Sequence, residues 1–199
     1  LRYDSAYGRS GFSVTTRERA LIVCGVEIMY LQEKDPLNLP WKELHINLVV
    51  EATGHFASAE KASVHLQAGA KRVVVSAPFE GYRENGESHQ DGTVLMGINE
   101  GELARCNVSS NASCTTNAAS PVIQILHETV GIEKAMLSTV HAYTSSQRLV
   151  DSADAKDWRR GRAAAQNIIP STTGAAEAVT RAITELNGLF DGIAVRVPI

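Results

Sequence analysis

The sequence predicts an α/β fold built on a parallel sheet, and three consecutive segments carry that prediction. Residues 46–50 form a short apolar run bounded by polar and glycine residues, as a buried strand would be. Residues 58–68 have the apolar spacing of a helix, and residues 73–75 are three valines, typical of a second strand. A strand, a helix and a strand in close succession form a βαβ unit, in which the two strands run parallel.

The segments on either side of this unit are also predicted from local pattern. Residues 21–23 and 26–28 are apolar runs separated by Cys24-Gly25, which is typical of a β-hairpin. Residues 80–92 are polar and contain glycine, so we expect a surface loop there. Residues 93–98 are then expected to form another strand.

A lone cysteine, Cys114, stands in the polar run 110–117, directly before a helical segment that Gly131 ends. Ser113 is a suitable N-cap, which places Cys114 in the first helical turn. Unpaired backbone N–H groups and the helix dipole favour an anion there, so the thiolate is favoured as a nucleophile. An isolated cysteine is more often a small buried residue. The flanking hydroxyls and amides are costly to bury without partners, however, which favours a site that faces a ligand.

Two further stretches indicate a base and an anion site. Residues 135–144 are predicted to be a strand, and His141 lies near its end, 27 residues after Cys114. One helix and one returning strand fill that interval, so the two side chains can meet. Residues 171–176 place hydroxyls and glycine at the start of a helix to about Leu186, where a phosphate binds readily, although plain capping is the alternative. Arg196 lies in a final apolar strand, where its charge needs an anionic partner.

Composition and charge exclude several classes of protein. The hydrophobic fraction of 44% and charged fraction of 21% are ordinary for a globular chain of 199 residues. A net charge of -3 gives no reason to expect nucleic acid or an acidic membrane surface as a partner, and no apolar run is long enough to span a bilayer. Cys24, Cys106 and Cys114 have the spacing of neither a disulfide framework nor a zinc site. We therefore expect no metal and a reducing, cytoplasmic compartment.

The run Ser-Asn-Ala-Ser-Cys-Thr-Thr-Asn at 110–117 resembles the active-site signature of the phosphorylating glyceraldehyde-3-phosphate dehydrogenase family. Further motifs similar to that family are 3–9, 33–36, 52–54, 76–78 and 140–144. The resemblance implies a partial Rossmann-type parallel-sheet NAD domain, residues 1–113, followed by part of an α+β catalytic domain, residues 114–199. The family normally opens with a Gly-x-Gly-x-x-Gly segment, which is absent here. The chain therefore resembles an internal fragment that lacks this segment and the C-terminal part.

The resemblance also implies an activity and a set of site residues. The reaction is NAD-dependent oxidation and phosphorylation of glyceraldehyde 3-phosphate to 1,3-bisphosphoglycerate, in glycolysis and gluconeogenesis, with inorganic phosphate as co-substrate. It passes through a thiohemiacetal and a thioester on Cys114, with His141 as the base. The remaining implied residues are Thr144 and Arg196 for the substrate phosphate, Ser113, Thr115, Thr173 and Gly174 for the attacking phosphate, and Lys34, Thr53, Gly54 and Ser76 for NAD. Residues 145–170 correspond to an S-shaped loop that lines the cofactor pocket of a neighbouring subunit in a homotetramer.

Several alternatives remain open at this point. The same chemistry acts on a longer sugar in erythrose-4-phosphate dehydrogenase. A cofactor-free cysteine acyltransferase or hydrolase fits the missing glycine segment, and a non-enzymatic interaction module is the third possibility. For the cofactor, NADP is possible beside NAD, because Ser152-Ala153 stands where NAD-strict members of the family often carry a Gly-Pro pair. Serine and alanine leave room, and a hydroxyl, for a 2′-phosphate.

Overall fold

The computed structural model describes residues 1–80 and 91–199, which fall into two units, Leu1–Leu39 and Pro40–Ile199. The first unit contains two small antiparallel sheets. One pairs β1 (Tyr3–Asp4) with β2 (Gly8–Arg9), and the other consists of β3 (Val14–Arg17), β4 (Ala20–Val23) and β5 (Val26–Met29). The 3₁₀ turn η1 (Pro36–Asn38) follows them. The predicted hairpin is confirmed as β4 and β5. Cys24 and Gly25 make its two-residue turn with φ values of 49° and 82°, the left-handed backbone that such tight hairpins require.

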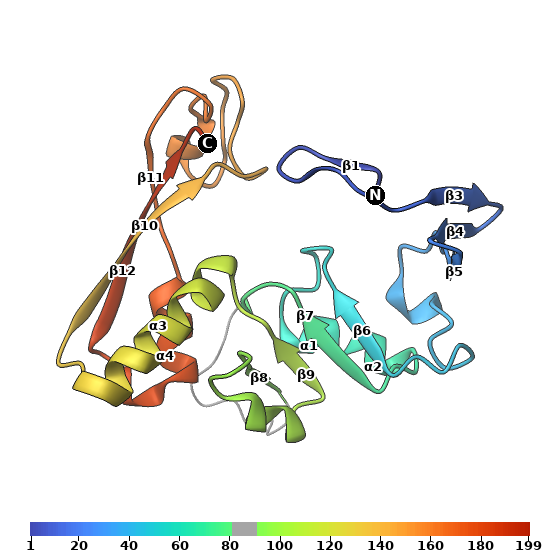
Figure 1. Cartoon of the computed structure of the whole chain (residues 1–199), viewed down its shortest axis with the longest axis horizontal. Helices are drawn as coiled ribbons and strands as arrows, with labels where there is room; N and C mark the ends of the chain where they lie inside the picture. The colour runs from blue at the N-terminus through green and yellow to red at the C-terminus, as the bar shows by residue number, and fades with distance from the viewer. Residues whose placement is uncertain (81–90) are drawn as a thin grey trace. The chain divides into compact units, whose positions relative to one another are not determined.

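The second unit begins with a four-stranded parallel sheet in the order β6-β7-β9-β8. Its strands are β6 (Leu48–Glu51), β7 (Arg72–Val75), β8 (Asp91–Thr93) and β9 (Val108–Ser110), and the short helices α1 (Ala59–Ala62) and α2 (Val64–Gln67) connect the first two (Figure 1). The predicted βαβ unit is therefore present, and the fold is α/β and Rossmann-type. Val49 of β6 and Val73 and Val75 of β7 are buried with Ala62 and Phe79, so this core lies between the sheet and the helices.

Three sequence predictions in this region need correction. The predicted helix 58–68 is two helices, α1 and α2, which meet at Ser63, and the Ser63 hydroxyl donates to the carbonyl of Glu60 (2.6 Å). The strand predicted for 93–98 ends at Thr93. Asn99 causes this ending: its side chain accepts from the Leu95 amide (2.8 Å) and donates to the Thr93 carbonyl (2.9 Å), which folds the chain into a turn.

The loop predicted for 80–92 also ends earlier, because Asp91 and Gly92 belong to β8. Residues 81–90 of that loop lie outside the described residues.

The rest of the second unit holds the long helix α3 (Cys114–Val130) and a three-stranded sheet. In that sheet β12 (Phe190–Val197) lies between the parallel strand β10 (Ala135–Ala142) and the antiparallel strand β11 (Ile169–Ser171). The helix α4 (Ala175–Ala182) and the 3₁₀ turns η2 (Glu100–Ala104), η3 (Trp158–Gly161) and η4 (Thr184–Leu186) complete it. The helix predicted to reach Leu186 thus stops at Ala182, where Ile183 leaves helical geometry (φ −120°, ψ 82°).

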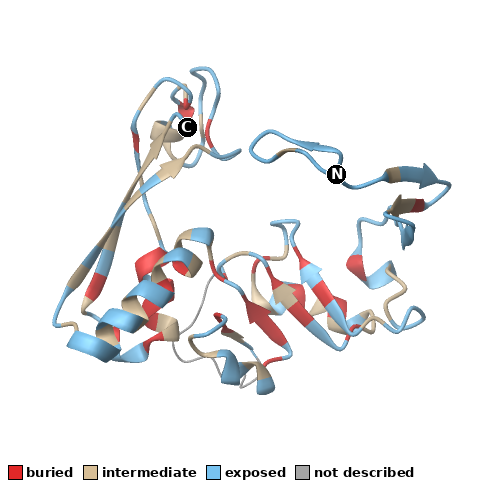
Figure 2. Ribbon diagram, in the orientation of Figure 1, coloured by how far each residue is buried: buried red, intermediate tan, exposed pale blue. Residues whose placement is uncertain are grey.

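Figure 2 shows where the buried residues of this part lie: on the facing sides of α3 and α4 and on the strands beside them. Val179, Ile183 and Leu186 of the α4 region pack against Ala119 and Ile123 of α3. A second cluster joins Leu95 and Ala112 to Ala178, which links the parallel sheet to α4. Of the helices in the described ranges, none has both the length and the apolar character needed to cross a membrane.

Gly69 gives a stability prediction for this fold. Its φ is +107°, and a Cβ there would lie 2.5 Å from Lys42 Cβ and 2.8 Å from Lys42 Cα. Gly69→Ala should therefore lower the free energy of unfolding by about 2–4 kcal/mol, through backbone strain and a steric clash together. Gly188→Ala is the matched control, since Gly188 also has a positive φ (+76°) but open space around it. The control should lose only about 1 kcal/mol in the same denaturant titration, and equal losses would contradict the role of the Lys42 contact.

Candidate active site

The first turn of α3 is set by its N-cap, Ser113. The Ser113 backbone is extended (φ −111°, ψ 165°), and its hydroxyl accepts a hydrogen bond from the Thr116 amide at 3.1 Å. Cys114 is consequently the first residue of the helix, and it is exposed. Its backbone N–H has no partner within the helix and points toward the N-terminal side, where a developing negative charge can be stabilised.

The polar run before α3 holds this turn in place. The side-chain NH₂ of Asn117 donates to the carbonyl oxygens of Asn111 (2.7 Å) and Ser113 (3.0 Å). Ser110 is buried, and its hydroxyl donates to the Ala77 carbonyl at 2.7 Å. Several of the polar groups that the sequence suggested would face a ligand are therefore satisfied within the chain. Their effect is to fix the position of Cys114.

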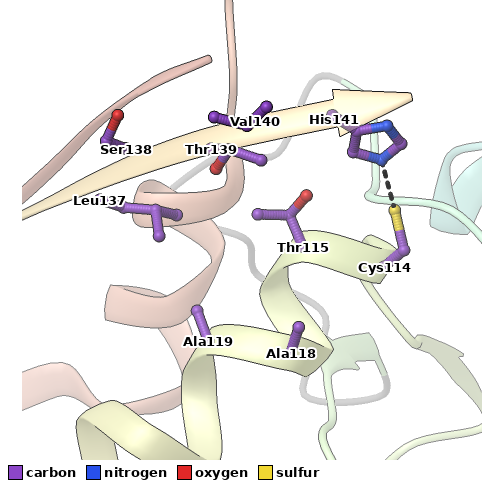
Figure 3. Close-up of a pocket in the computed structure, with 9 residues that line it drawn as sticks. All are labelled: Cys114, Thr115, Ala118, Ala119, Leu137, Ser138, Thr139, Val140 and His141. Atoms are coloured by element: carbon purple, nitrogen blue, oxygen red, sulfur yellow. Dashed lines mark hydrogen bonds between the residues drawn. The ribbon is translucent and has the colours of Figure 1, made fainter. Parts of the chain in front are cut away.

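His141 lies at the end of β10 and meets Cys114. Its Nε2 is 3.2 Å from the cysteine Sγ. Figure 3 shows the two side chains pointing toward one another across a pocket of about 470 Å³ between α3 and β10. Thr115, Ala118 and Ala119 line the pocket from the helix, and residues 137–140 line it from the strand. The structure thus brings together the nucleophile and the base that the sequence predicted.

The other face of the imidazole is held by a backbone carbonyl. His141 Nδ1 is 2.7 Å from the oxygen of Ala142, which can only accept, and this contact favours a proton on Nδ1. In that tautomer Nε2 presents its lone pair to the Cys114 thiol and can take the thiol proton. The carbonyl of Ala142 therefore favours the tautomer that a base requires.

Arg196 approaches the same carbonyl from the neighbouring strand. The register of the parallel pair β10–β12 places Arg196 directly beside His141. Arg196 Nη1 donates to the Ala142 oxygen at 3.1 Å and also contacts His141 Nδ1. Because a guanidinium only donates, the contact with Nδ1 favours the opposite tautomer, and Ala142 and Arg196 compete for this nitrogen. Among the residues that the structure describes, no carboxylate forms an ion pair with this half-buried guanidinium, so its charge is available to an anion.

Thr144 follows β10, at the same end of the sheet as Arg196. Its amide donates to the side-chain oxygen of Gln147 (2.8 Å), and its hydroxyl pairs with that of Ser146 (2.9 Å). Gln147 is buried and fixes the turn that carries Thr144. Sequence reasoning missed Gln147, because a glutamine in an irregular stretch gives no sign of being buried.

The residues predicted for the attacking phosphate lie on two helices. Ser113 caps α3 and Thr115 lines the pocket beside Cys114. Thr173 accepts a hydrogen bond from the Ala175 amide (3.1 Å), and Gly174 is the N-cap residue of α4. No hydrogen bond among the described residues joins Thr173 or Gly174 to Cys114 or His141. The observed contact of Thr173 is therefore a local turn before the helix, and α4 has no side-chain cap.

The residues predicted for NAD lie in both units. Thr53 and Gly54 follow β6, and Ser76 follows the adjacent parallel strand β7, so all three lie at the carboxyl edge of the sheet, where ligands of such sheets bind. Gly54 has φ +75° and open space where a Cβ would be, so a ligand can approach its backbone. These residues fit a dinucleotide. Lys34 is exposed and belongs to the first unit.

Comparisons with known proteins identify the family. Residues 113–199 match the family model described as glyceraldehyde 3-phosphate dehydrogenase, C-terminal domain, and residues 1–59 match the NAD binding domain of the same enzyme. The chain is 46% identical over 198 residues to glyceraldehyde-3-phosphate dehydrogenase B of Aspergillus oryzae. It is also 46% identical to glyceraldehyde-3-phosphate dehydrogenase of Geobacillus stearothermophilus and to glyceraldehyde-3-phosphate dehydrogenase 2 of Danio rerio. The chain belongs to the glyceraldehyde-3-phosphate dehydrogenase family.

These matches cover all of this chain and 57% of each of the three relatives. The predicted fold class and family are both confirmed. The roles of the individual site residues rest on the geometry given above and remain predictions.

The reactivity of Cys114 can be compared with that of a second exposed thiol in the same chain. Cys24 is also exposed but lies in a hairpin turn, with neither a histidine partner nor a helix terminus, while Cys106 is buried. Burial raises the pKa of the Cys106 thiol, with Glu102 and Asp91 adding to the effect. Iodoacetamide should therefore label Cys114 much faster than Cys24 near neutral pH, and Cys106 slowest, as measured by peptide mass spectrometry.

His141→Asn provides the test of the base in that experiment. It should slow the labelling of Cys114 while leaving that of Cys24 unchanged, and it should slow catalysis by about 10²–10⁴-fold. Equal labelling rates for Cys114 and Cys24 in the unchanged protein would contradict an activated nucleophile.

Proposed function

We propose that this protein catalyses the glycolytic oxidation and phosphorylation of glyceraldehyde 3-phosphate to 1,3-bisphosphoglycerate with NAD. The names of its relatives give the aldehyde and its dehydrogenation. The observation that carries the proposal is the 3.2 Å contact of Cys114 Sγ with His141 Nε2 at the N-terminus of α3. A thiolate that a histidine holds at a helix N-terminus is suited to attack a carbonyl carbon. Membership of the family supplies the substrate class.

The residues of the chain divide the reaction between them. Cys114 attacks the aldehyde carbon as the thiolate, after His141 Nε2 has taken its proton, and a thiohemiacetal forms. The Cys114 backbone N–H lies where it can donate to the oxyanion. His141 gives its proton to that oxygen and takes it back as the carbon is oxidised to a thioester. Inorganic phosphate then attacks the thioester carbon, the acyl phosphate leaves, and the Cys114 thiolate is restored.

Bound NAD supplies the hydride acceptor in this scheme. We assign Thr53, Gly54 and Ser76 to its binding from their position at the carboxyl edge of the sheet, and Lys34 from the family motif alone. NAD is the preferred dinucleotide, and Ser152-Ala153 leaves room for some use of NADP. Ser113, Thr115, Thr173 and Gly174 are assigned to the attacking phosphate, and Thr144 and Arg196 to the phosphate of the substrate.

The organisation of the whole protein belongs to the same proposal. We place the boundary between the NAD-binding and catalytic domains at Cys114, which the match of residues 113–199 to the C-terminal domain supports. The irregular stretch 145–170 supports a homotetramer in which this loop lies against a neighbouring subunit. The three free cysteines support a reducing, cytoplasmic compartment.

Phosphate dependence tests the proposed reaction. With glyceraldehyde 3-phosphate and NAD but no inorganic phosphate, the purified protein should form about one equivalent of NADH per active site and then stop, because the thioester accumulates. Adding phosphate should restore steady turnover. Steady NADH formation without phosphate would show that water releases the acyl group from the thioester, and it would contradict the phosphorylating reaction. No NADH under either condition, from protein whose Cys114 is reactive, would contradict the dehydrogenase activity. Erythrose 4-phosphate in parallel decides between the two sugar substrates through kcat/KM.

Arg196 gives a prediction for substrate recognition. Arg196→Leu should raise the KM for glyceraldehyde 3-phosphate far more than the KM for unphosphorylated glyceraldehyde, because a charge-assisted contact with the phosphate is lost. Any fall in kcat that comes from the lost contact with Ala142 should affect both substrates alike. Arg196→Lys is the matched control, since it keeps the charge and should give a smaller rise in KM. If the KM rises equally for both substrates, the arginine does not bind the phosphate.

A further inference from the structure

A cluster of two buried polar side chains and one partly buried tryptophan lies directly beneath the predicted NAD-binding turn, and the reaction makes no use of it. It consists of Glu51, His65 and Trp41, called the Glu51 cluster below. Glu51 and His65 are both 4% exposed, and their side chains contact one another, Oε2 to Nε2, at 2.9 Å. A buried carboxylate is costly unless it is paired and fully hydrogen-bonded, so its presence at this position needs a reason.

The geometry defines the hydrogen atoms of the cluster. The indole Nε1 of Trp41 lies 3.1 Å from His65 Nδ1, and an indole N–H can only donate. Nδ1 of His65 is therefore the acceptor, and Nε2 carries the proton that it donates to Glu51. The rings agree with this arrangement, because Trp41 is tilted against His65 with centroids 6.3 Å apart. The imidazole is neutral and its tautomer is fixed by the tryptophan.

The second oxygen of Glu51 holds the turn. Glu51 Oε1 accepts from the Thr53 backbone amide at 2.7 Å and from the Thr53 hydroxyl. Burial alone would raise the pKa of the Glu51 carboxyl, but the hydrogen bonds from Thr53 and His65 outweigh it, and the pKa is lowered. The group is thus a carboxylate at neutral pH that accepts from three donors.

The backbone of Glu51 contacts another predicted NAD residue, Ser76, and the His65 ring contacts the far end of the turn. The Glu51 carbonyl accepts from the Ser76 amide at 2.9 Å. Phe56, which follows the exposed residues 52–55, meets the His65 ring edge to face with centroids 6.0 Å apart. The turn is therefore clamped on both sides by buried groups, while its own residues remain exposed.

We propose that Glu51 is a positioning residue for the dinucleotide: supported by His65 and Trp41, its carboxylate holds residues 52–55 in the conformation that binds NAD. This assignment rests on the proposed function, because NAD is the ligand that the turn would contact. Glu51 touches no reacting atom, and its effect is on binding of the cofactor rather than on the chemical step.

Glu51→Gln is the direct test, because the amide keeps the shape but cannot accept from all three donors. If its oxygen faces Thr53, its NH₂ faces the N–H of His65, and if it turns around, its NH₂ faces the Thr53 amide. In both orientations two N–H donors face each other with no acceptor between them, so a hydrogen bond is lost and the turn loosens. The Kd and KM for NAD should rise about tenfold or more, as expected for loss of a buried hydrogen bond, while kcat at saturating NAD stays within about threefold.

Glu60→Gln is the matched control, since it makes the same chemical change on the exposed first turn of α1. It should leave the Kd for NAD unchanged. The labelling rate of Cys114 should be the same in both variants, which shows that the catalytic domain is folded. A loss of Cys114 reactivity in Glu51→Gln alone would show general unfolding and would contradict a role confined to the turn.

Hydrogen exchange gives a readout that needs no ligand. The Thr53 amide should exchange about tenfold faster in Glu51→Gln than in the unchanged protein, with no such change in Glu60→Gln. Unaltered Thr53 exchange would show that Glu51 does not hold the turn. This measurement distinguishes failure of the positioning role from failure of the proposed function. If the unchanged protein does not bind NAD, the proposed function fails. Hydrogen exchange of the Thr53 amide then still decides whether Glu51 orders the turn. If it binds NAD and Glu51→Gln binds as tightly, Glu51 has no positioning role and the proposed function stands.

A second variant tests the fixed tautomer. Trp41→Phe removes the donor to His65 Nδ1 and keeps an aromatic ring. In a double variant with Glu51→Gln, His65 is then free to move its proton to Nδ1, and its Nε2 can accept from the introduced amide NH₂. The double variant should therefore bind NAD more tightly than Glu51→Gln alone, even though its thermal stability is lower. A purely structural loss would lower both properties together, and that result would overturn the assigned roles of Trp41 and His65.

Discussion

The geometry of the site depends on where α3 begins. Ser113 caps the helix, and the Asn117 side chain donates to the carbonyl oxygens of Asn111 and Ser113, which directly precede it. Cys114 is therefore the first residue with helical backbone. A start one residue earlier or later would rotate the cysteine by about 100° around the helix axis and away from His141. The contact between nucleophile and base is thus decided by hydrogen bonds of residues that take no part in the chemistry.

Much of the fold could be predicted, because its signals are local. The start of α3 at Ser113 and its end at Gly131 follow from cap chemistry, and the hairpin and the βαβ unit follow from apolar pattern and turn residues. The expected strand ended early because one side chain competes with the backbone pattern. Asn99 ends it at Thr93, and the expected helix is divided at Ser63, and neither break depends on the apolar spacing that was used.

The site was predicted only where residue type and spacing point to chemistry. Cys114 and His141 stand out in the sequence, and resemblance to the family supplied the phosphate and NAD residues. Gln147 and His65 did not stand out, because a polar residue that is buried and hydrogen-bonded looks like any surface residue in the sequence, and the partly buried Trp41 gives no sign of its bond to His65. In the opposite sense, Ser110 and Asn117 looked as though they faced a ligand, whereas the chain itself provides their partners.

One carbonyl connects the base to the arginine proposed to bind the substrate phosphate. The Ala142 oxygen has two lone pairs and accepts from both His141 Nδ1 and Arg196 Nη1, so the two donors need not compete. A guanidinium has five N–H groups, and one of them is used here. Arg196 can therefore keep its hold on Ala142 while its remaining N–H groups bind an anion. Arg196 Nη1 also contacts His141 Nδ1, and because a guanidinium only donates, that contact favours an unprotonated Nδ1. A phosphate that draws the guanidinium away from Nδ1 leaves the Ala142 oxygen as the partner of Nδ1, and this favours the tautomer in which Nε2 is the base toward Cys114.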